Sequence, residues 1–279
     1  MNYRYIPAIL LFVVAALPAA ARNVPDDEED PYFILTGQAA EAIDSCDYES
    51  AAARLLEAMS LRPNSPENVL LLSNIGMVYS YMDQDSLALM TLNRALEIAP
   101  SMRTVLANRA NVLLKTGRTK EAYRDLDAII GIDSTNVDAR YTHALLAIGF
   151  GDMQRAKADM AVVRDADPES LMTSVGMSTI YTLEGQHREA LPYLERLVVD
   201  SGTEEDYAAL ASCQLELEKL SDAGATIAKG MGKFPESGEL YLCRARLNRA
   251  RYDRKSAEAD ARRARQLGIE PARIKAHGL

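Results

Sequence analysis

Two consecutive stretches of the chain share one pattern: VLLLSNIGMVYSYMDQDSLALMTLNRALEIAPSM at residues 69–102 and RTVLANRANVLLKTGRTKEAYRDLDAIIGIDSTN at residues 103–136. The pattern recurs in VDARYTHALLAIGFGDMQRAKADMAVVRDADPES at residues 137–170. Each stretch is 34 residues long, with apolar segments on both sides of a short polar break. The amphipathic period of a single helix does not explain a repeat of this length. A larger structural unit is therefore predicted to recur along the chain.

The period extends in both directions from this region. The predicted units are residues 32–65, 69–102, 103–136, 137–170, 171–203, 204–237 and 238–271. Residues 22–31 precede them as an acidic flexible linker, and residues 272–279 follow as a C-terminal tail.

Three positions of the unit carry the pattern. The twentieth is alanine in every unit: Ala51, Ala88, Ala122, Ala156, Ala190, Ala223 and Ala257. The eighth is always small: Ala39, Gly76, Ala110, Ala144, Ser178, Ala211 and Ala245. The twenty-fourth is a larger apolar residue in all but the last unit: Leu55, Leu92, Leu126, Met160, Leu194, Ile227 and Ala261. Small residues at two fixed points let two helices cross closely, and a larger residue one turn later fills the space beside the crossing.

Helix stop signals divide each unit into two halves. Glycine in the polar break, as at Gly117 and Gly185, suits a helix C-terminus followed by a tight turn. A second stop near the unit end is often a proline, which cannot continue a helix: Pro63, Pro100, Pro168 and Pro235. Each unit is therefore predicted to be a helix, a turn and a second helix.

This pattern resembles the tetratricopeptide repeat (TPR) family over residues 32–271. The resemblance implies an all-α fold, a right-handed superhelical solenoid of about seven helix-turn-helix repeats. The chain departs from the family at the fourth position, where the family prefers Trp and this chain has none. It also departs at the seventh position, usually apolar, which holds Arg109, His143 and Arg244 in three units.

The resemblance further implies a concave groove, lined by the first helix of each repeat, that receives another protein or peptide. Carried over to this sequence, the candidate partner-binding residues are Asn74, Met77, Asn108, Asn111, Lys115, Tyr141, Leu145, Ile148, Thr179, Arg246 and Arg249. Tyr141 is the preferred anchor, since a tyrosine buries a large area and keeps a polar tip. Packing against the neighbouring helix is the alternative for each position.

One form of recognition in the family is not expected. Some members grip a C-terminal carboxylate with Lys, Arg and Asn side chains, and Asn74 and Asn108 match its asparagines. Thr36, Thr104 and Asp138 stand where basic partners would be needed.

Charge is unevenly distributed along the chain. The net charge is −9, which disfavours nucleic acid, since phosphate neutralisation supplies most non-specific binding. Residues 238–279 nevertheless hold eleven Lys and Arg against five Asp and Glu. This basic end is either a docking patch for an acidic partner, an anionic glycan or a membrane surface, or the solvated face of a terminal repeat. A self-contact with the acidic residues 26–30 is a third interpretation.

Residues 1–21 are predicted to be a cleaved signal peptide. Arg4 precedes the apolar stretch Ile6 to Leu17, and Ala19-Ala20-Ala21 is a small-residue cleavage pattern. The stretch is short for a membrane span, although an uncleaved anchor is the alternative. We therefore expect a periplasmic or secreted protein with no stable transmembrane span after cleavage.

No catalytic, cofactor or metal site is predicted. The three histidines are far apart and lack partners at metal-ligand spacing, and no nucleophile or phosphate-loop motif occurs. Cys46, Cys213 and Cys243 form an odd set, expected to be free and buried; a Cys213–Cys243 disulfide is the alternative.

The leading hypothesis is a non-enzymatic scaffold or adaptor in the cell envelope that holds a partner peptide or protein on its concave surface. The alternative is a structural envelope component. It would self-associate, or dock an anionic glycan or membrane surface through its basic C-terminal repeat.

Overall fold

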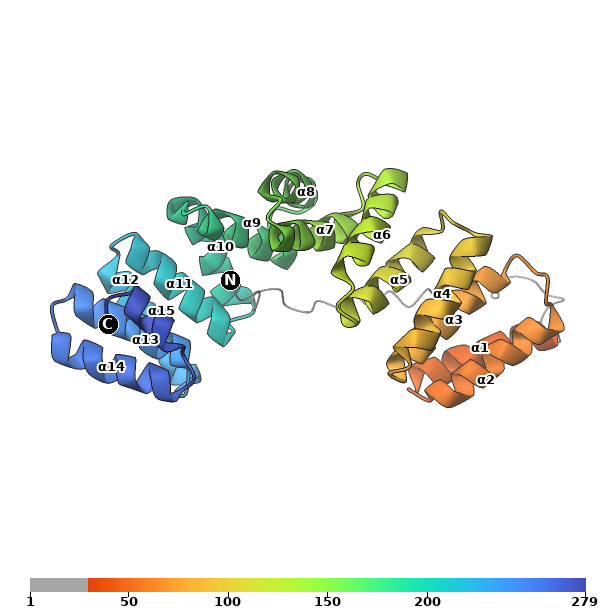
Figure 1. Ribbon diagram of the computed structural model, residues 1–279, viewed down its shortest axis with the longest axis horizontal. Coiled ribbons are helices and arrows are strands. Elements are labelled where there is room, and N and C mark those ends of the chain that lie inside the picture. The colour runs from red at the N-terminus through yellow and green to blue at the C-terminus, as the bar shows by residue number, and fades with distance from the viewer. Residues whose placement is uncertain (1–29) are drawn as a thin grey trace. The chain divides into compact units, whose positions relative to one another are not determined.

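A computed structural model describes residues 30–279, and this range contains fifteen helices and no strand (Figure 1). The predicted signal peptide at residues 1–21 and most of the acidic linker lie outside the described residues. The last two linker residues lie at the start of the first helix. The Asp30 carboxylate accepts the N–H of Tyr32 as an N-cap, and Pro31 is the first helical residue.

The helices fall into two compact units, which meet in sequence between Phe150 and Gly151. The first unit contains α1 (Pro31–Asp44), α2 (Tyr48–Leu61), α3 (Asn68–Tyr81), α4 (Asp85–Ile98), α5 (Arg103–Lys115), α6 (Thr119–Ile132) and α7 (Val137–Phe150). The second contains α8 (Met153–Ala166), α9 (Leu171–Leu183), α10 (His187–Asp200), α11 (Glu204–Glu216), α12 (Leu220–Lys233), α13 (Gly238–Ala250), α14 (Arg254–Gln266) and α15 (Pro271–Ala276). The division falls inside the predicted fourth repeat, between its two helices.

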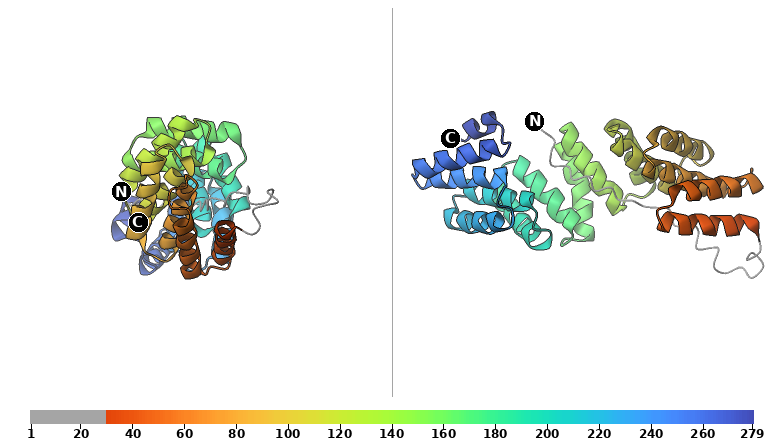
Figure 2. Two further views of the ribbon diagram at one scale, coloured as in Figure 1. Left: turned by 90° about the vertical axis from the view of Figure 1, so that its right-hand side faces the viewer. Right: turned by 90° about the horizontal axis from the view of Figure 1, so that it is seen from below.

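Within each unit, consecutive helices pack as pairs, as α1 with α2 and α13 with α14 illustrate (Figure 2). The first helix of a pair also contacts the second helix of the pair before it, as α3 contacts α2 and α11 contacts α10. First helices of successive pairs touch as well, α3 with α5 and α11 with α13. Each pair therefore buries its apolar faces against its neighbours, and the all-α helix-turn-helix prediction is confirmed.

The small-residue columns lie at the helix crossings. All seven twentieth-position alanines are at most 2% exposed, and the eighth-position residues are also buried. A methyl group added at Gly76 would stand 2.6 Å from Cγ of Leu92 and 3.3 Å from the carbonyl oxygen of Ala88. The eighth, twentieth and twenty-fourth positions thus meet inside one repeat, as their sizes predict.

In the turn between the two helices of each repeat, the residue at the fifteenth position of the repeat has a left-handed backbone conformation. Positive φ angles occur there at Cys46 (60°), Asp83 (58°), Gly117 (74°), Gly151 (81°), Gly185 (71°), Glu218 (55°) and Tyr252 (64°). Glycine adopts this region without steric cost, whereas a bulky residue rarely does. Tyr252 is the largest side chain in this column.

Side-chain caps fix where several helices begin. Asp47, Asp152 and Asp253 accept the backbone N–H three residues later and cap α2, α8 and α14. Ser170 and Ser237 do the same for α9 and α13, and Thr203 and Asp206 form a reciprocal capping box on α11.

The predicted C-terminal tail is partly helical. Helix α15 begins at Pro271 and places Ile274, which is 7% exposed, in a cluster with Leu242, Ala264 and Ile269. The tail therefore covers the apolar end of the last repeat. None of the helices in residues 30–279 is both long enough and apolar enough to cross a membrane.

Candidate functional site

Five of the eleven predicted partner-binding residues are buried: Asn74 (1% exposed), Met77 (2%), Asn108 (0%), Tyr141 (1%) and Leu145 (6%). Tyr141, expected as the anchor, lies in the interior, and burial raises the pKa of its phenol to about 12. The reason is visible at Ser73, which shares the fifth position with Tyr141. Its hydroxyl accepts a 2.9 Å hydrogen bond from the Asn108 amide. Position five thus faces the next first helix, and a large side chain there is enclosed.

Polar side chains on the first helices link successive repeats. The Lys115 ammonium on α5 donates to the carbonyl oxygen of Ser80 at 2.6 Å and to the Asp83 carboxylate at 2.8 Å. Burial alone would lower the pKa of Lys115, but its hydrogen bonds to Asp83 and Asp85 outweigh that effect and raise it. Lys115 therefore ties the third repeat to the turn of the second.

Arg246 plays the corresponding role in the second unit. Its guanidinium on α13 donates to the Ser212 hydroxyl at 2.7 Å and to the Glu216 carboxylate at 2.6 Å, both on α11. Only 13% of its side chain is exposed. These hydrogen bonds between repeats were not predicted from the sequence. The pattern that would indicate them is a pair of polar residues about one repeat apart, on first helices that are neighbours.

The remaining candidates are divided between the two units. Asn111 and Ile148 are half-buried in the first unit, and Thr179 is half-buried on α9 in the second. Arg249, on α13, is exposed. Of the predicted residues, Arg246 and Arg249 share a pocket.

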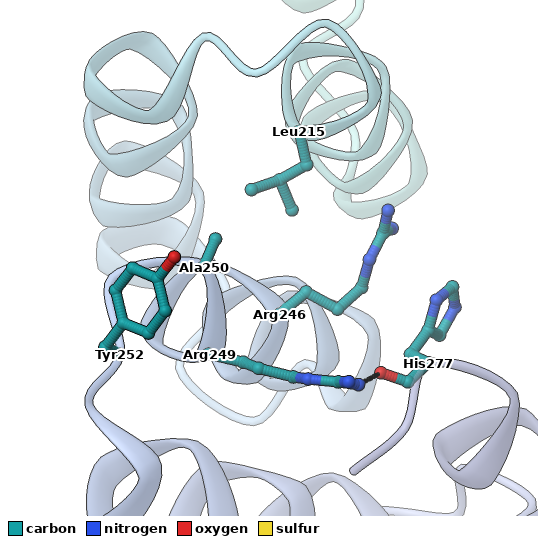
Figure 3. A pocket seen from close by; sticks show the side chains of 6 residues that line it. All are labelled: Leu215, Arg246, Arg249, Ala250, Tyr252 and His277. Atoms are coloured by element: carbon teal, nitrogen blue, oxygen red, sulfur yellow. Dashed lines mark hydrogen bonds between the residues drawn. The ribbon is translucent and has the colours of Figure 1, made fainter.

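This pocket, the Arg249 pocket, has a volume of about 350 Å³ and is lined by Leu215, Arg246, Arg249, Ala250, Tyr252 and His277 (Figure 3). Arg249 donates a hydrogen bond to the backbone carbonyl oxygen of His277. Tyr252 and His277 stand on opposite sides of the pocket, with Leu215 facing Arg249 across it. The lining therefore combines two guanidinium groups, an aliphatic wall and an aromatic rim.

The imidazole of His277 responds to this setting. Partial burial lowers its pKa, and the nearby positive charges of Arg246, Arg273 and Arg249 lower it further, against an opposing effect of Glu216. At neutral pH this imidazole is therefore uncharged, and the arginines supply the positive charge of the pocket.

A second pocket in the same unit, of about 240 Å³, is lined by Lys157, Ala161, Arg164, Met177, Ile180 and Tyr181. Its cations are already paired with carboxylates of the same unit: Lys157 with Glu184 at 2.5 Å, and Arg164 with Asp165 at 3.0 Å. Its charges are thus less available to a ligand than that of Arg249.

Solved structures with the same arrangement of helix pairs decide the fold. A tetratricopeptide repeat protein from Parabacteroides merdae is 24% identical, with a TM-score of 0.64, over 88% of this chain and 97% of its own. PilW, a type IV pilus biogenesis factor, is 21% identical, with a TM-score of 0.61, over 76% of this chain and 97% of its own. This chain has the tetratricopeptide-repeat fold. No protein-family model and no curated protein sequence matches it.

YrrB, described as a TPR protein with an unusual peptide-binding site, is 19% identical, with a TM-score of 0.57, over 67% of this chain and 98% of its own. Similarity at this level concerns the TPR fold alone.

Two of the three unusual seventh positions of these TPR units pair with an aspartate on the second helix of the same repeat. Arg109 forms two hydrogen bonds, 2.8 and 2.6 Å, to the carboxylate of Asp125, sixteen residues later on the second helix. Arg244 pairs in the same way with Asp260, at 2.9 and 2.6 Å. A basic seventh position is thus matched by an aspartate at position twenty-three, which is a pattern readable from sequence.

The three cysteines of the TPR units are free. Cys213 and Cys243 are buried and direct their thiols at the carbonyl oxygens of His187 and Ala208, so they do not form the alternative disulfide. Burial raises their pKa values to about 11 and about 12. Cys46 is exposed in the first turn, contrary to the expectation that it is buried.

Proposed function

We propose that this chain is a protein-binding scaffold of the cell envelope, which holds a segment of a partner protein against the first helices of its repeats. The observation that carries the proposal is the Arg249 pocket. Its lining comes from α11, from α13 and the turn after it, and from His277, which follows α15. Arg246, Arg249 and Ala250 occupy the ninth, twelfth and thirteenth positions of the last repeat. These positions lie on the first helix of the repeat, which the TPR resemblance assigns to the binding face. The envelope location rests on the sequence of residues 1–21.

Other first-helix residues of the second unit support an extended contact. Thr179 and Leu215 are half-buried, and Thr182 is exposed, on α9 and α11. The threonine hydroxyl groups could form hydrogen bonds with a peptide backbone, and the leucine side chain offers contact area to apolar side chains of the peptide.

We propose binding rather than catalysis at this face. The charged groups that line the Arg249 pocket are guanidinium groups, a chemistry that suits binding and orienting anions rather than transferring protons.

A second candidate function is docking to an anionic surface through the basic end. On α14, Arg254 has 92% of its side chain exposed, and Arg262 and Arg265 are also exposed. Such a face would attract a polyanionic glycan or membrane by long-range electrostatics, with strong dependence on salt.

The test is affinity capture from envelope extracts with residues 22–279 as bait, comparing Leu215→Glu and Thr179→Glu with Ala228→Glu. Ala228 is exposed on the second helix α12 and provides a matched control for the added charge. We expect the first two variants to lose the same partner while the control keeps it, with unchanged circular dichroism spectra. Equal capture by all three variants would contradict binding at this face. Loss of capture only on reversing Arg254, Arg262 and Arg265 would support the second function.

A further inference from the structure

We propose that the Arg249 pocket binds the carboxylate of an aspartate or glutamate in an extended partner segment, and that Tyr252 packs over an apolar residue beside that acid. This inference rests on the proposed function and adds the chemistry of the partner.

The charge of Arg249 has no carboxylate partner within the described residues. Most arginines around it already have a carboxylate partner: Arg246 with Glu216, Arg244 with Asp260, Arg263 with Glu236 and Arg273 with Glu239. Arg249 is different. In residues 30–279 its recorded partner is the backbone carbonyl oxygen of His277, a neutral acceptor, and no carboxylate oxygen lies within 4.0 Å of it. Its charge is therefore available to an external anion.

The two guanidinium groups of the pocket are held in place before a ligand binds. One N–H of Arg249 is held by His277, while Ser212 and Glu216 fix Arg246 beside it. A guanidinium has further N–H donors in a planar fork that matches a carboxylate in bidentate geometry. Less side-chain freedom is lost on binding when the guanidinium is already held in place.

The apolar part of the pocket lining favours a peptide over a simple anion. Leu215 and Ala250 lie beside the two arginines in the pocket (Figure 3). An acid flanked by an aliphatic or aromatic residue satisfies both halves of this surface, whereas a glycan or lipid phosphate satisfies the charged half alone.

Tyr252 adds a large aromatic side chain to the pocket. Its φ of 64° lies in the left-handed region, as does that of the equivalent turn residue of every repeat, three of which are glycines and three of which are Cys46, Asp83 and Glu218. Its side chain is 96% exposed at the rim of the pocket, so the ring is available to pack against an apolar side chain of a bound peptide.

The test is selection of a phage-displayed library of random heptapeptides on the full chain, followed by affinity measurements on the recovered peptides. We expect enrichment of an Asp or Glu next to a large apolar residue. Arg249→Glu should weaken binding of these peptides about tenfold or more. Arg262→Glu should change it less than about twofold, because Arg262 makes the same charge change on α14 outside the pocket. Recovered peptides with no acid enrichment, or equal binding by Arg249→Glu, would overturn the carboxylate assignment.

A second variant separates function from folding. Tyr252→Gly places the residue best suited to a positive φ in the turn, so its melting temperature should equal or exceed that of the parent chain. Its affinity for the recovered acidic peptides should nevertheless fall about threefold or more, through lost aromatic contact. Unchanged affinity would remove Tyr252 from the site.

The two levels of the proposal fail in different ways. If the recovered peptides show no preference for acidic residues and fail to bind the Leu215→Glu variant, the proposed function stands and the carboxylate site is rejected. If no peptide is recovered, the carboxylate site is rejected. The proposed function is then judged by the envelope capture. Binding of phosphatidylglycerol vesicles that is lost in Arg249→Glu, with no peptide bound, would assign the pocket to lipid instead.

Discussion

Removing Arg109 should destabilise the chain because it strands the carboxylate of Asp125. Only 6% of the Asp125 side chain is exposed, and two hydrogen bonds from Arg109 satisfy it. Breaking a buried pair from one side costs about 3–5 kcal/mol, since an uncompensated charge remains. Arg109 itself is 26% exposed, so water can partly replace it. We therefore expect Arg109→Ala to lower the free energy of unfolding by about 2–3 kcal/mol.

The double variant isolates the cause. Replacing both partners, as Arg109→Met with Asp125→Leu, leaves no buried charge and keeps similar volume, so it should stay within about 1 kcal/mol of the parent chain. The Arg118–Glu121 pair, with both side chains 47% exposed, is a control on the same repeat. Arg118→Ala should have little measurable effect, because water screens an exposed pair.

The measurement is urea unfolding followed by far-ultraviolet circular dichroism, arranged as a double-mutant cycle. A coupling energy near zero between Arg109 and Asp125, or a double variant as unstable as the sum of the single variants, would refute the reasoning.

Three further predictions concern packing, thiol reactivity and pH. Gly76→Ala should destabilise by about 1–3 kcal/mol in the same urea assay, since its methyl would stand 2.6 Å from Leu92. Gly37 lies inside α1, and a methyl group added there would have no atom within 4 Å, so Gly37→Ala should instead stabilise the chain by about 0.5–1 kcal/mol. If both variants changed the free energy of unfolding in the same direction, the close contact between Gly76 and Leu92 would be contradicted. In a thiol-reagent assay, Cys46 should react at once and the two buried thiols only after unfolding; three fast thiols would disprove their burial. Hydrogen bonds from Ser50 and Ser256 lower the pKa values of Asp47 and Asp253, which cap α2 and α14. The ionised caps therefore stabilise the folded chain above the unfolded-state pKa of an aspartate, near pH 4. This stabilisation is lost as the pH falls from that value through the lower folded-state pKa values. Replacing these caps with asparagine, which caps without titrating, should flatten the acid limb of helix content against pH, and an unchanged limb would count against the assignment.

The repeat register was predictable because it depends on local constraints that recur. Alanine at position twenty of every repeat needs no knowledge of distant residues to be recognised as a close crossing, and all of these alanines are buried. Gly117 and Gly185 likewise mark turns whose positive φ the structure shows. The pairing of Arg109 with Asp125 was also readable, as a charge match sixteen residues apart within one repeat.

The binding residues were less predictable, because a repeat position does not fix exposure. Leu145 and Arg246 share the ninth position, yet Leu145 is 6% exposed and Arg246 is held by two residues of the preceding repeat. Arg249 and Tyr252 line the open pocket together with His277. Arg249 was among the predicted binding residues, whereas the repeat pattern gave no reason to expect Tyr252 there.

The amino-acid sequence by itself determined the period, the helix pairs and the crossing points, since these follow from residue size and backbone preference within about one repeat. Tertiary structure alone decided which first-helix side chains remain open. Tyr141 is enclosed, whereas Arg249 stays accessible and lacks a carboxylate partner within residues 30–279. The physical reason is that burial and charge pairing belong to the atoms around a side chain, and residues from neighbouring repeats supply those atoms.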